Sequence, residues 1–198
     1  MLRSLQINRI MKNYINKYFE TVSENFLNFK NQTSEINLAV DEIINSIKSD
    51  RKIIFCGNGG SASDSQHLAT ELIGRYRDDR DPLPAIAITT DTSALTAIGN
   101  DYGFDNIFSR QIAGIGKAGD TLVAISTSGK SKNIINAVET ARKMSIKVVG
   151  LTGKNKSELS NLCDICIHAQ SDKTNHIQEM HIAVGQLICE MVENNLFK

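Results

Sequence analysis

Hydroxyl side chains are concentrated in the run Ser126-Thr127-Ser128-Gly129-Lys130-Ser131. Four hydroxyls just before a predicted helix suit a phosphate monoester, because O–H and backbone N–H groups can surround its oxygens and the helix dipole adds a favourable potential. A helix N-cap is the alternative interpretation, but a cap needs only one hydroxyl. The run therefore favours a phosphate-binding loop.

A second loop, Gly57-Asn58-Gly59-Gly60-Ser61, is rich in glycine and also precedes a predicted helix. Glycine lets the backbone approach a ligand closely, and a helix N-terminus offers unpaired N–H groups, although a plain tight turn can have the same composition. The loop lacks both the GxGxxG pattern of dinucleotide-binding proteins and the lysine of a P-loop. Neither kind of nucleotide site is therefore expected here.

Two predicted helices carry further side chains that could act on a substrate or hold a metal ion. His67 and Glu71 are four residues apart and share one helix face. They can be two metal ligands, a carboxylate base with its neighbour, or a surface pair, and spacing alone favours the surface pair. Gln178 and Gln186, eight residues apart in the last helix, lie on nearly the same face.

The elements that must position these residues follow from hydrophobic patterning. Short apolar runs predict strands over 52–56, 83–88, 121–125, 147–151 and 164–167. Amphipathic stretches between them predict helices over 62–75, 92–98, 105–115, 131–144 and 174–196. Such alternation is typical of a parallel sheet covered by helices on both faces. Ligands bind these sheets beyond the carboxyl ends of the strands, where both loops are expected.

The first part of the chain predicts two amphipathic helices, over 8–29 and 33–47. Their apolar stripes face different ways, which suggests that they pack on something beyond one sheet, for instance a neighbouring subunit. We therefore predict a helical extension for oligomer packing over residues 1–49 and an α/β domain over residues 50–198.

The balance of charge and the hydropathy exclude several classes of protein. The 198 residues include 22 basic and 22 acidic side chains, so no basic surface for direct nucleic-acid binding is expected. The charged run 75–81 neutralises itself and is interpreted as a solvated loop rather than a binding patch. No stretch approaches about 20 apolar residues, and the N-terminus lacks the apolar segment of a signal peptide, so no membrane association is expected.

The four cysteines lie in apolar stretches, which is typical of buried thiols in a reducing compartment. Cys163 and Cys166 have CxxC spacing, but no second pair or nearby His completes a zinc set. We interpret this pair as structural and expect the protein to be cytoplasmic.

Taken together, the motifs resemble the sugar isomerase (SIS) domain, and specifically the phosphoheptose isomerase family. The matching stretches are Cys56–Ser61, His67–Glu71 with Gly74–Arg77, Ala97–Phe104, Phe108–Arg110, Ile125–Gly129, Leu151–Gly153 and Ile177–His181. The resemblance covers the chain from residue 50 to the end, and the two N-terminal helices fit the family's layout. It implies an SIS-type sandwich, with about five parallel strands, helices on both faces and an N-terminal helical pair.

The resemblance also implies an activity. Members of the family convert sedoheptulose 7-phosphate into D-glycero-D-manno-heptose 7-phosphate through an enediol, for heptose synthesis in lipopolysaccharide. They are homotetramers with sites built between subunits. A small sugar phosphate is the expected partner, beside the other copies of the chain.

Roles for individual residues follow from the same resemblance. The phosphate would be held by Ser126, Thr127, Ser128 and Ser131. The sugar site would be lined by Asn58, Gly59, Gly60, Glu71, Asn100, Asp101 and Gln178. Glu71 would be the base that moves a proton between adjacent carbons. One zinc ion would be held by His67, Glu71, Gln178 and the residue at position 186.

Position 186 departs from the family, which has there a His that is both the fourth zinc ligand and the acid in isomerisation. The amide of Gln186 can coordinate a metal through its oxygen, but it cannot donate and regain a proton near neutral pH. His181 lies five residues earlier, turned by about 140° past a full helical turn, so it does not substitute from the same face. Weakened zinc binding, altered acid catalysis, or both are therefore expected.

Two other functions remain open on the sequence. One is a non-catalytic SIS adaptor that resembles the replication-initiator-associating protein; the other is a module that senses a sugar phosphate. The adaptors lose the catalytic carboxylate, whereas Glu71 is kept here, and the sensor needs neither Glu71 nor a metal. The kept carboxylate and the uninterrupted loop 126–129 favour the enzyme, and Gln186 favours the alternatives.

Overall fold

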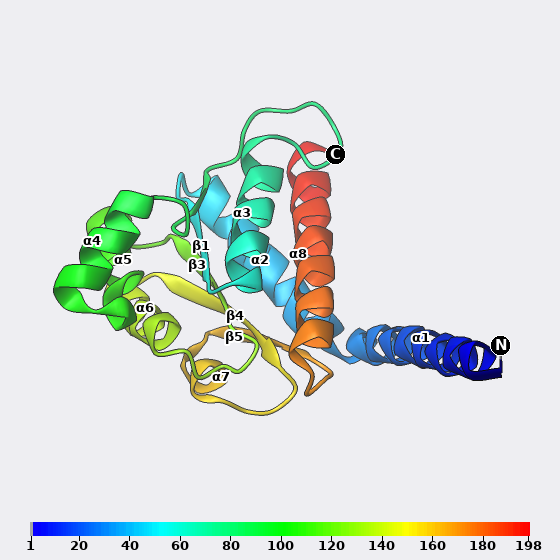
Figure 1. The fold of residues 1–198 in the computed structure, drawn as a ribbon. Helices are drawn as coiled ribbons and strands as arrows, with labels where there is room; N and C mark the ends of the chain where they lie inside the picture. Colours follow the sequence, from blue (N-terminus) through cyan, green and yellow to red (C-terminus); the bar gives the residue numbers. More distant parts are fainter. Residues whose placement is uncertain (1) are drawn as a thin grey trace.

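A five-stranded parallel sheet forms the centre of the computed structural model, which describes residues 2–198 and the side chains from residue 10 onward (Figure 1). The strand order is β2-β1-β3-β4-β5, and every neighbouring pair is parallel. The strands are β1 (Ile53–Gly57), β2 (Ala85–Ala87), β3 (Thr121–Ile125), β4 (Lys147–Gly153) and β5 (Ile165–Ala169). All five predicted strands are thus present, and the predicted fold class is confirmed.

Helices cover both faces of the sheet because alternate strand residues point to opposite sides. Ile53 and Phe55 of β1 belong to one apolar layer, and Ile54 and Cys56 belong to the other. The first layer also contains apolar residues of α2 (Thr33–Lys48), α3 (Gly60–Ile73) and α8 (Thr174–Phe197). The second contains those of α5 (Ser109–Ile115), α6 (Lys132–Lys143) and α7 (Glu158–Leu162).

Two segments differ from the expected elements. The helix predicted over 105–115 is broken into a 3-10 turn, Phe104–Asn106, and α5, since the chain turns at Gly103 after α4 (Thr92–Tyr102) with a φ of 83°. Helix α7 was not predicted, because its five residues are too short to show a helical period. It is started by Ser157 and Ser160, each of which accepts a hydrogen bond from the other's backbone N–H.

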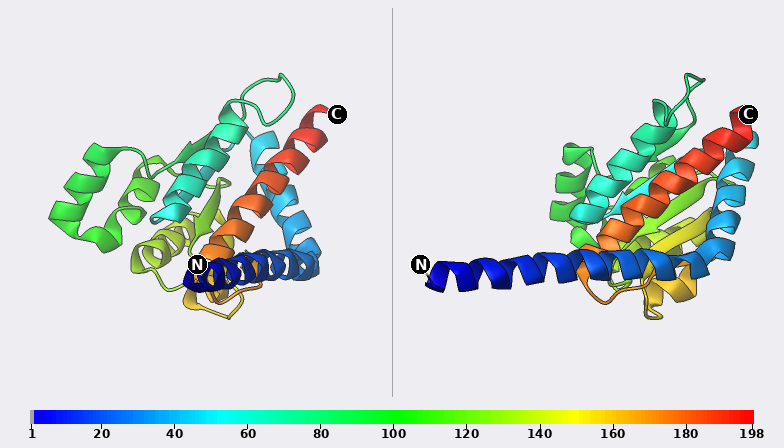
Figure 2. Two further views of the ribbon diagram at one scale, coloured as in Figure 1. Left: turned by 45° about the vertical axis from the view of Figure 1, so that its right-hand side comes forward. Right: turned by 90° about the vertical axis from the view of Figure 1, so that its right-hand side faces the viewer.

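The N-terminal helical pair is present, as α1 (Leu2–Phe29), a short 3-10 turn (Lys30–Gln32) and α2. The apolar face of α2 is buried in the core, with Val40 and Ile43 each 2% exposed. By contrast, α1 extends well beyond the body of the molecule (Figure 2). The proposed division of the chain at residue 50 stays a prediction.

Within residues 2–198, no helix combines the length and apolar character needed to cross a membrane.

Candidate active site

The strand order creates a topological switch point between β1 and β3. These two strands are neighbours, but the chain leaves β1 for α3 on one face of the sheet and leaves β3 for α6 on the other. Ligands of open α/β sheets bind at this kind of reversal, beyond the carboxyl ends of the strands. The glycine-rich loop follows β1 and the Ser/Thr loop follows β3, so the fold brings the two predicted loops to one place.

A reciprocal pair of amides joins the two loops. Nδ2 of Asn58 donates to Oδ1 of Asn133 at 2.9 Å, and Nδ2 of Asn133 donates back to Oδ1 of Asn58 at 2.8 Å. Asn58 follows β1, while Asn133 is buried in the first turn of α6. Asn133 was missed from the sequence because its partner is 75 residues away. The pair fixes the distance between the glycine-rich loop and the helix after the Ser/Thr loop.

The Ser/Thr loop has hydroxyls on both its inner and its outer side. Ser126 is buried, and its Oγ lies 3.1 Å from Oγ of Ser131, the residue before α6. Ser128 is exposed, and its Oγ accepts a hydrogen bond from the backbone N–H of Lys130 at 3.2 Å. The chain turns at Gly129, between Ser128 and Lys130, with a φ of 61°, a backbone conformation that favours glycine.

A cavity of about 250 Å³ borders this loop on the side of β4 and β5. It is lined by Thr127 and Ser128 and by the exposed side chains of Lys130, Lys154 and Lys156. Lys154 forms an ion pair with Asp172. The excess of cationic groups over acidic ones beside the hydroxyls is the electrostatic environment that a phosphate dianion requires.

The side chains of His67 and Glu71 are in contact, whereas their spacing in the sequence showed only that they share a helix face. Nε2 of His67 lies 2.9 Å from Oε1 of Glu71 on α3, and the Glu71 side chain is 19% exposed against 45% for His67. A carboxylate that faces solvent on one side and an imidazole on the other can accept a proton from a substrate.

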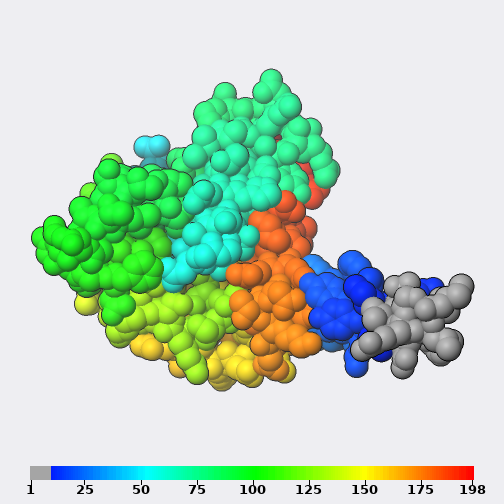
Figure 3. Space-filling model, in the orientation of Figure 1, coloured from blue at the N-terminus to red at the C-terminus, as the bar shows by residue number. Residues whose placement is uncertain are grey.

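Gln178 lies against the start of α3. A Cβ added at Gly60 would be 2.5 Å from Nε2 of Gln178, so only glycine leaves room for this amide. Helices α3 and α8 pack along each other, and their exposed surfaces lie side by side in cyan and orange (Figure 3). The structure thus brings Gln178 beside the glycine-rich loop.

Gln186 is half-buried and lies farther along α8. The residue before it, Gly185, packs against Leu68, and a Cβ there would be 2.4 Å from a methyl of Leu68. Gln186 thus directly follows Gly185, which packs against Leu68, and Leu68 directly follows His67. His181, in contrast, is in the core, where its Nε2–H donates to the carbonyl of Thr152 at 3.1 Å. As predicted, it does not take the place of Gln186.

Two predicted sugar-binding residues lie apart from the loops in the single chain. Asn100 and Asp101 are exposed at the C-terminal end of α4, where Nδ2 of Asn100 donates to Oδ1 of Asp101 at 2.8 Å. Gly59, by contrast, belongs to the glycine-rich loop, caps the start of α3 with a φ of 54° and is exposed.

Asp64, which was not predicted, lies one helical turn before His67. Its Oδ2 is buried and has no hydrogen-bond partner among the described residues. Burial raises the pKa of Asp64, and the nearby His67 lowers it by less. No spacing rule marks this residue, because its distinguishing feature is burial.

The predicted zinc ligands combine two strong donors with two weak ones. His67 and Glu71 already converge, and an imidazole nitrogen and a carboxylate oxygen are donors that zinc prefers. Gln178 and Gln186 offer only amide oxygens, and residues 10–198 contain no cluster of three or more His, Cys, Asp or Glu side chains arranged to hold a metal ion. Within the single chain, the structure brings only His67 and Glu71 of these four residues into contact.

The chain matches known proteins along most of its length. Residues 17–153 match the family model of the SIS domain. A phosphoheptose isomerase from Akkermansia muciniphila is 48% identical over 94% of this chain and 99% of its own length. One from Rhodospirillum rubrum is also 48% identical, over 94% of this chain and 99% of its own length.

Solved structures agree with these sequence matches. The phosphoheptose isomerase of Neisseria gonorrhoeae superimposes with a TM-score of 0.88 at 37% identity, covering 93% of this chain and 99% of that one. The enzyme of Francisella tularensis gives a TM-score of 0.89 at 36% identity, covering 92% and 97%. The chain therefore belongs to the phosphoheptose isomerase family of SIS-domain proteins.

Proposed function

We propose that this chain is a ketose–aldose isomerase that converts sedoheptulose 7-phosphate into D-glycero-D-manno-heptose 7-phosphate. The observation that carries the proposal is the end-to-end likeness to phosphoheptose isomerases, 48% identical over 94% of the chain. The contact between Glu71 and His67 supports it, because it joins a carboxylate to an imidazole on one face of α3.

Glu71 is the base in this reaction. Its carboxylate takes the proton from C1 of the ketose, and the electron pair of that C–H bond forms the C1=C2 double bond. The π pair of the C2 carbonyl moves to O2, which takes a proton from water. The resulting enediol gives the proton of its O1 hydroxyl to water, and the electron pair of that O–H bond forms the C1=O1 bond of the aldehyde. The π pair of the C1=C2 bond then takes the proton that Glu71 returns to C2. One carboxylate can serve both steps because the two carbons are adjacent.

The phosphate end of the substrate binds at the Ser/Thr loop in this proposal. Ser126, Thr127, Ser128 and Ser131 supply hydroxyl groups, and the lysines around the neighbouring cavity supply positive charge. Asn58, Gly59, Gly60 and Gln178 line the sugar site together with Asn100 and Asp101, which are exposed at the end of α4. The phosphate thus anchors one end of the substrate at the Ser/Thr loop.

His67, Glu71, Gln178 and Gln186 would hold a zinc ion. A bound zinc ion would polarise the carbonyl oxygen of the substrate and so acidify the adjacent C–H group. Gln186 can donate an N–H hydrogen bond to an enediolate oxygen, but it cannot transfer a proton to it. We therefore expect weak zinc binding and a slower protonation step than a His at this position would give.

The assembly proposed for this enzyme is a homotetramer in the cytoplasm, serving heptose synthesis for lipopolysaccharide. It is supported by the apolar side chains that α1 leaves exposed, among them Ile15 and Phe19. The alternative of a non-catalytic adaptor is not favoured, because the likeness to phosphoheptose isomerases covers the whole domain and Glu71 is in place.

A turnover assay on sedoheptulose 7-phosphate, with and without added zinc, tests the proposal. Glu71→Gln removes the base but keeps the size and a hydrogen-bonding group, so we expect turnover to fall by about 100- to 10,000-fold. Gln186→His is expected to raise zinc affinity or turnover, since it adds a nitrogen donor that can also transfer a proton.

The control is the circular dichroism spectrum and the assembly size of each variant, which we expect to match those of the wild-type protein. Persistent turnover in Glu71→Gln would refute the assigned base. A wild-type protein without turnover under any zinc concentration would refute the enzyme and favour the adaptor, for which a search for a protein partner would come next.

A further inference from the structure

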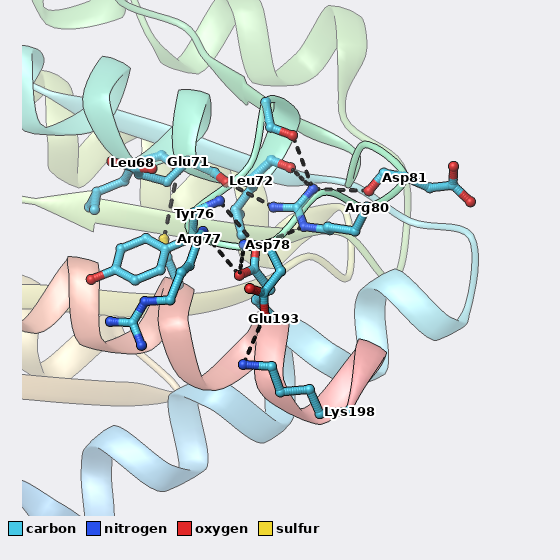
Figure 4. A network of polar contacts seen from close by, with 12 residues as sticks. Leu68, Glu71, Leu72, Tyr76, Arg77, Asp78, Arg80, Asp81, Glu193 and Lys198 are labelled. Carbon is cyan, nitrogen blue, oxygen red and sulfur yellow. Dashed lines mark hydrogen bonds and ion pairs between the residues drawn. The ribbon is translucent and has the colours of Figure 1, made fainter.

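Arg80 and Glu193 form a buried ion pair beside the end of α3 (Figure 4). Nε of Arg80 lies 3.0 Å from Oε2 of Glu193, and each side chain is only 2% exposed. The interpretation of residues 75–81 as a solvated loop is therefore wrong for Arg80, although Arg75, Arg77, Asp78, Asp79 and Asp81 are exposed.

Arg80 caps the C-terminus of α3. Its Nη2 donates to the carbonyl of Glu71 at 2.9 Å, and its Nη1 donates to the carbonyl of Leu72 at 2.8 Å and, less closely, to that of Gly74 at 3.4 Å. The last carbonyls of a helix have no partner within the helix, so an external donor stabilises the final turn. The planar guanidinium reaches several carbonyls at once, which a lysine cannot do.

Glu193 orients this guanidinium and the loop before it. Its carboxylate accepts hydrogen bonds from the backbone N–H groups of Tyr76 at 3.0 Å and of Arg77 and Asp78 at 3.1 Å, in addition to Arg80. Burial raises the pKa of Glu193, but these hydrogen bonds together lower it by more than burial raises it. The pKa of Glu193 therefore lies below its usual range. The last turns of α8 thus hold both the loop and the end of α3.

We propose that Arg80 and Glu193 are positioning residues for Glu71, and this inference rests on the proposed function of Glu71 as the base. Glu71 is two residues from the end of α3, and its carbonyl is bonded to Arg80 while its carboxylate contacts His67. Without the cap, the final turn of α3 frays and the carboxylate loses its fixed place. A misplacement of about 1 Å can cost about 100-fold in rate.

The proposal separates catalysis from substrate binding. The Ser/Thr loop and the glycine-rich loop are held by β1, β3 and the Asn58–Asn133 pair, none of which contacts Arg80 through a hydrogen bond in the described residues. Loss of the cap should therefore lower kcat and leave KM nearly unchanged. A defect that only reduced the amount of folded protein would change neither constant per folded molecule.

The test uses Arg80→Lys and Glu193→Gln in the full-length protein. Lys keeps the positive charge beside Glu193 but loses the fork that reaches the helix carbonyls, and Gln keeps an acceptor but loses the charge. We expect kcat to fall by about 10- to 100-fold in both variants, with KM within about threefold of the wild-type value. Assays are run well below the unfolding temperature of each variant.

Arg77→Met is the matched control on the same loop. Arg77 forms an exposed ion pair with Glu190 at 3.1 Å, which contributes little because both groups are hydrated. Kinetic constants equal to those of the wild-type protein are expected for this variant. Equal values for Arg80→Lys as well would overturn the proposal.

Hydrogen exchange provides a readout that does not depend on turnover. The N–H of Gly74 bonds to the carbonyl of Thr70 at 2.8 Å in the final turn of α3, and we expect Arg80→Lys to accelerate its exchange by about 10-fold or more. Unchanged exchange together with a lower kcat would overturn the proposed route through the helix end. If the wild-type protein has no turnover, the proposed function fails, and exchange alone then decides whether Arg80 holds Glu71 in place.

Discussion

His67 and His181 differ in role because their side chains differ in burial. His67 is half-exposed and contacts Glu71, so its ring is accessible from solvent. His181 is fully buried between α8 and β4, and its Nδ1 has no hydrogen-bond partner among the described residues. Burial lowers the pKa of His181 to about 4, and the hydrogen bond to the Thr152 carbonyl opposes this only in part.

The buried His181 should make the stability of the fold depend on pH. Its pKa is lower in the folded chain than the usual value near 6.5, so the unfolded chain binds the proton first as the pH falls. The stability that neutral His181 contributes to the fold is complete above about pH 7 and is lost as the pH falls from about 6.5 to about 4. Between pH 7 and pH 5 the loss in the free energy of unfolding amounts to about 2 kcal/mol.

Urea unfolding at pH 7 and pH 5 measures this effect. His181→Gln can keep a hydrogen bond to the Thr152 carbonyl but does not titrate, so its free energy of unfolding should fall by about 2 kcal/mol less than that of the wild-type protein over this range. Identical pH dependence in the two proteins would show that His181 does not remain neutral in the fold.

At the scale of elements, the candidate site depends on how the loops after β1 and β3 are joined to each other. The Asn58–Asn133 pair is the contact that does this, since each amide both donates and accepts. Asn58 was predicted to bind the sugar, and one N–H and the oxygen of its amide are already bonded to Asn133. Within the single chain it therefore acts on the shape of the glycine-rich loop.

Asn133→Ala should weaken substrate binding. The substitution leaves the half-buried amide of Asn58 without its partner and costs about 1–3 kcal/mol of stability. The two loops then lose their fixed spacing, and we expect KM for the sugar phosphate to rise by about fivefold or more. Steady-state kinetics and thermal unfolding measure the two effects.

Asn136→Ala is the control for this variant on the same helix. Its amide donates to the carbonyl of Asp105 at 2.9 Å, away from the glycine-rich loop. An unchanged KM is expected. Similar increases in KM for both variants would mean that α6 as a whole, and not the amide pair, sets the loop spacing.

At the scale of the whole molecule, α1 is incompletely covered. Phe19 is 63% exposed and Ile15 is 50% exposed, and the helix extends beyond the body of the chain (Figure 2). It is held to α8 where the hydroxyl of Tyr18 donates to Glu179. An apolar helix face of this kind is typical of a surface that contacts another protein chain.

Phe19→Glu should disrupt the proposed assembly, because it places a charge in the centre of the apolar face. Light scattering coupled to size-exclusion chromatography should report about four times the 21.8 kDa chain mass for the wild-type protein and a smaller assembly for the variant. Glu24→Lys changes a charge on a face of α1 turned by about 140° from Phe19 and should leave the mass unchanged. A monomeric wild-type protein would refute the tetramer.

The sequence by itself determined the strands, most helices and the family. Apolar runs such as residues 121–125 can only be buried, and the periods of 3.6 and 2 residues are local properties of the chain. The loops were also found, because glycines and hydroxyls cluster within six residues. The short α7 and the break at Gly103 were missed, since a few residues do not establish a period.

Only the tertiary structure decided which of these residues act together. Arg80 was assigned to solvent from its charged neighbours, but its partner Glu193 is 113 residues away and removes both from water. Asn133 and the place of Gln178 beside Gly60 likewise depend on contacts between distant segments. A hydrogen bond depends on distance and direction in space, and the local sequence encodes neither for residues so far apart.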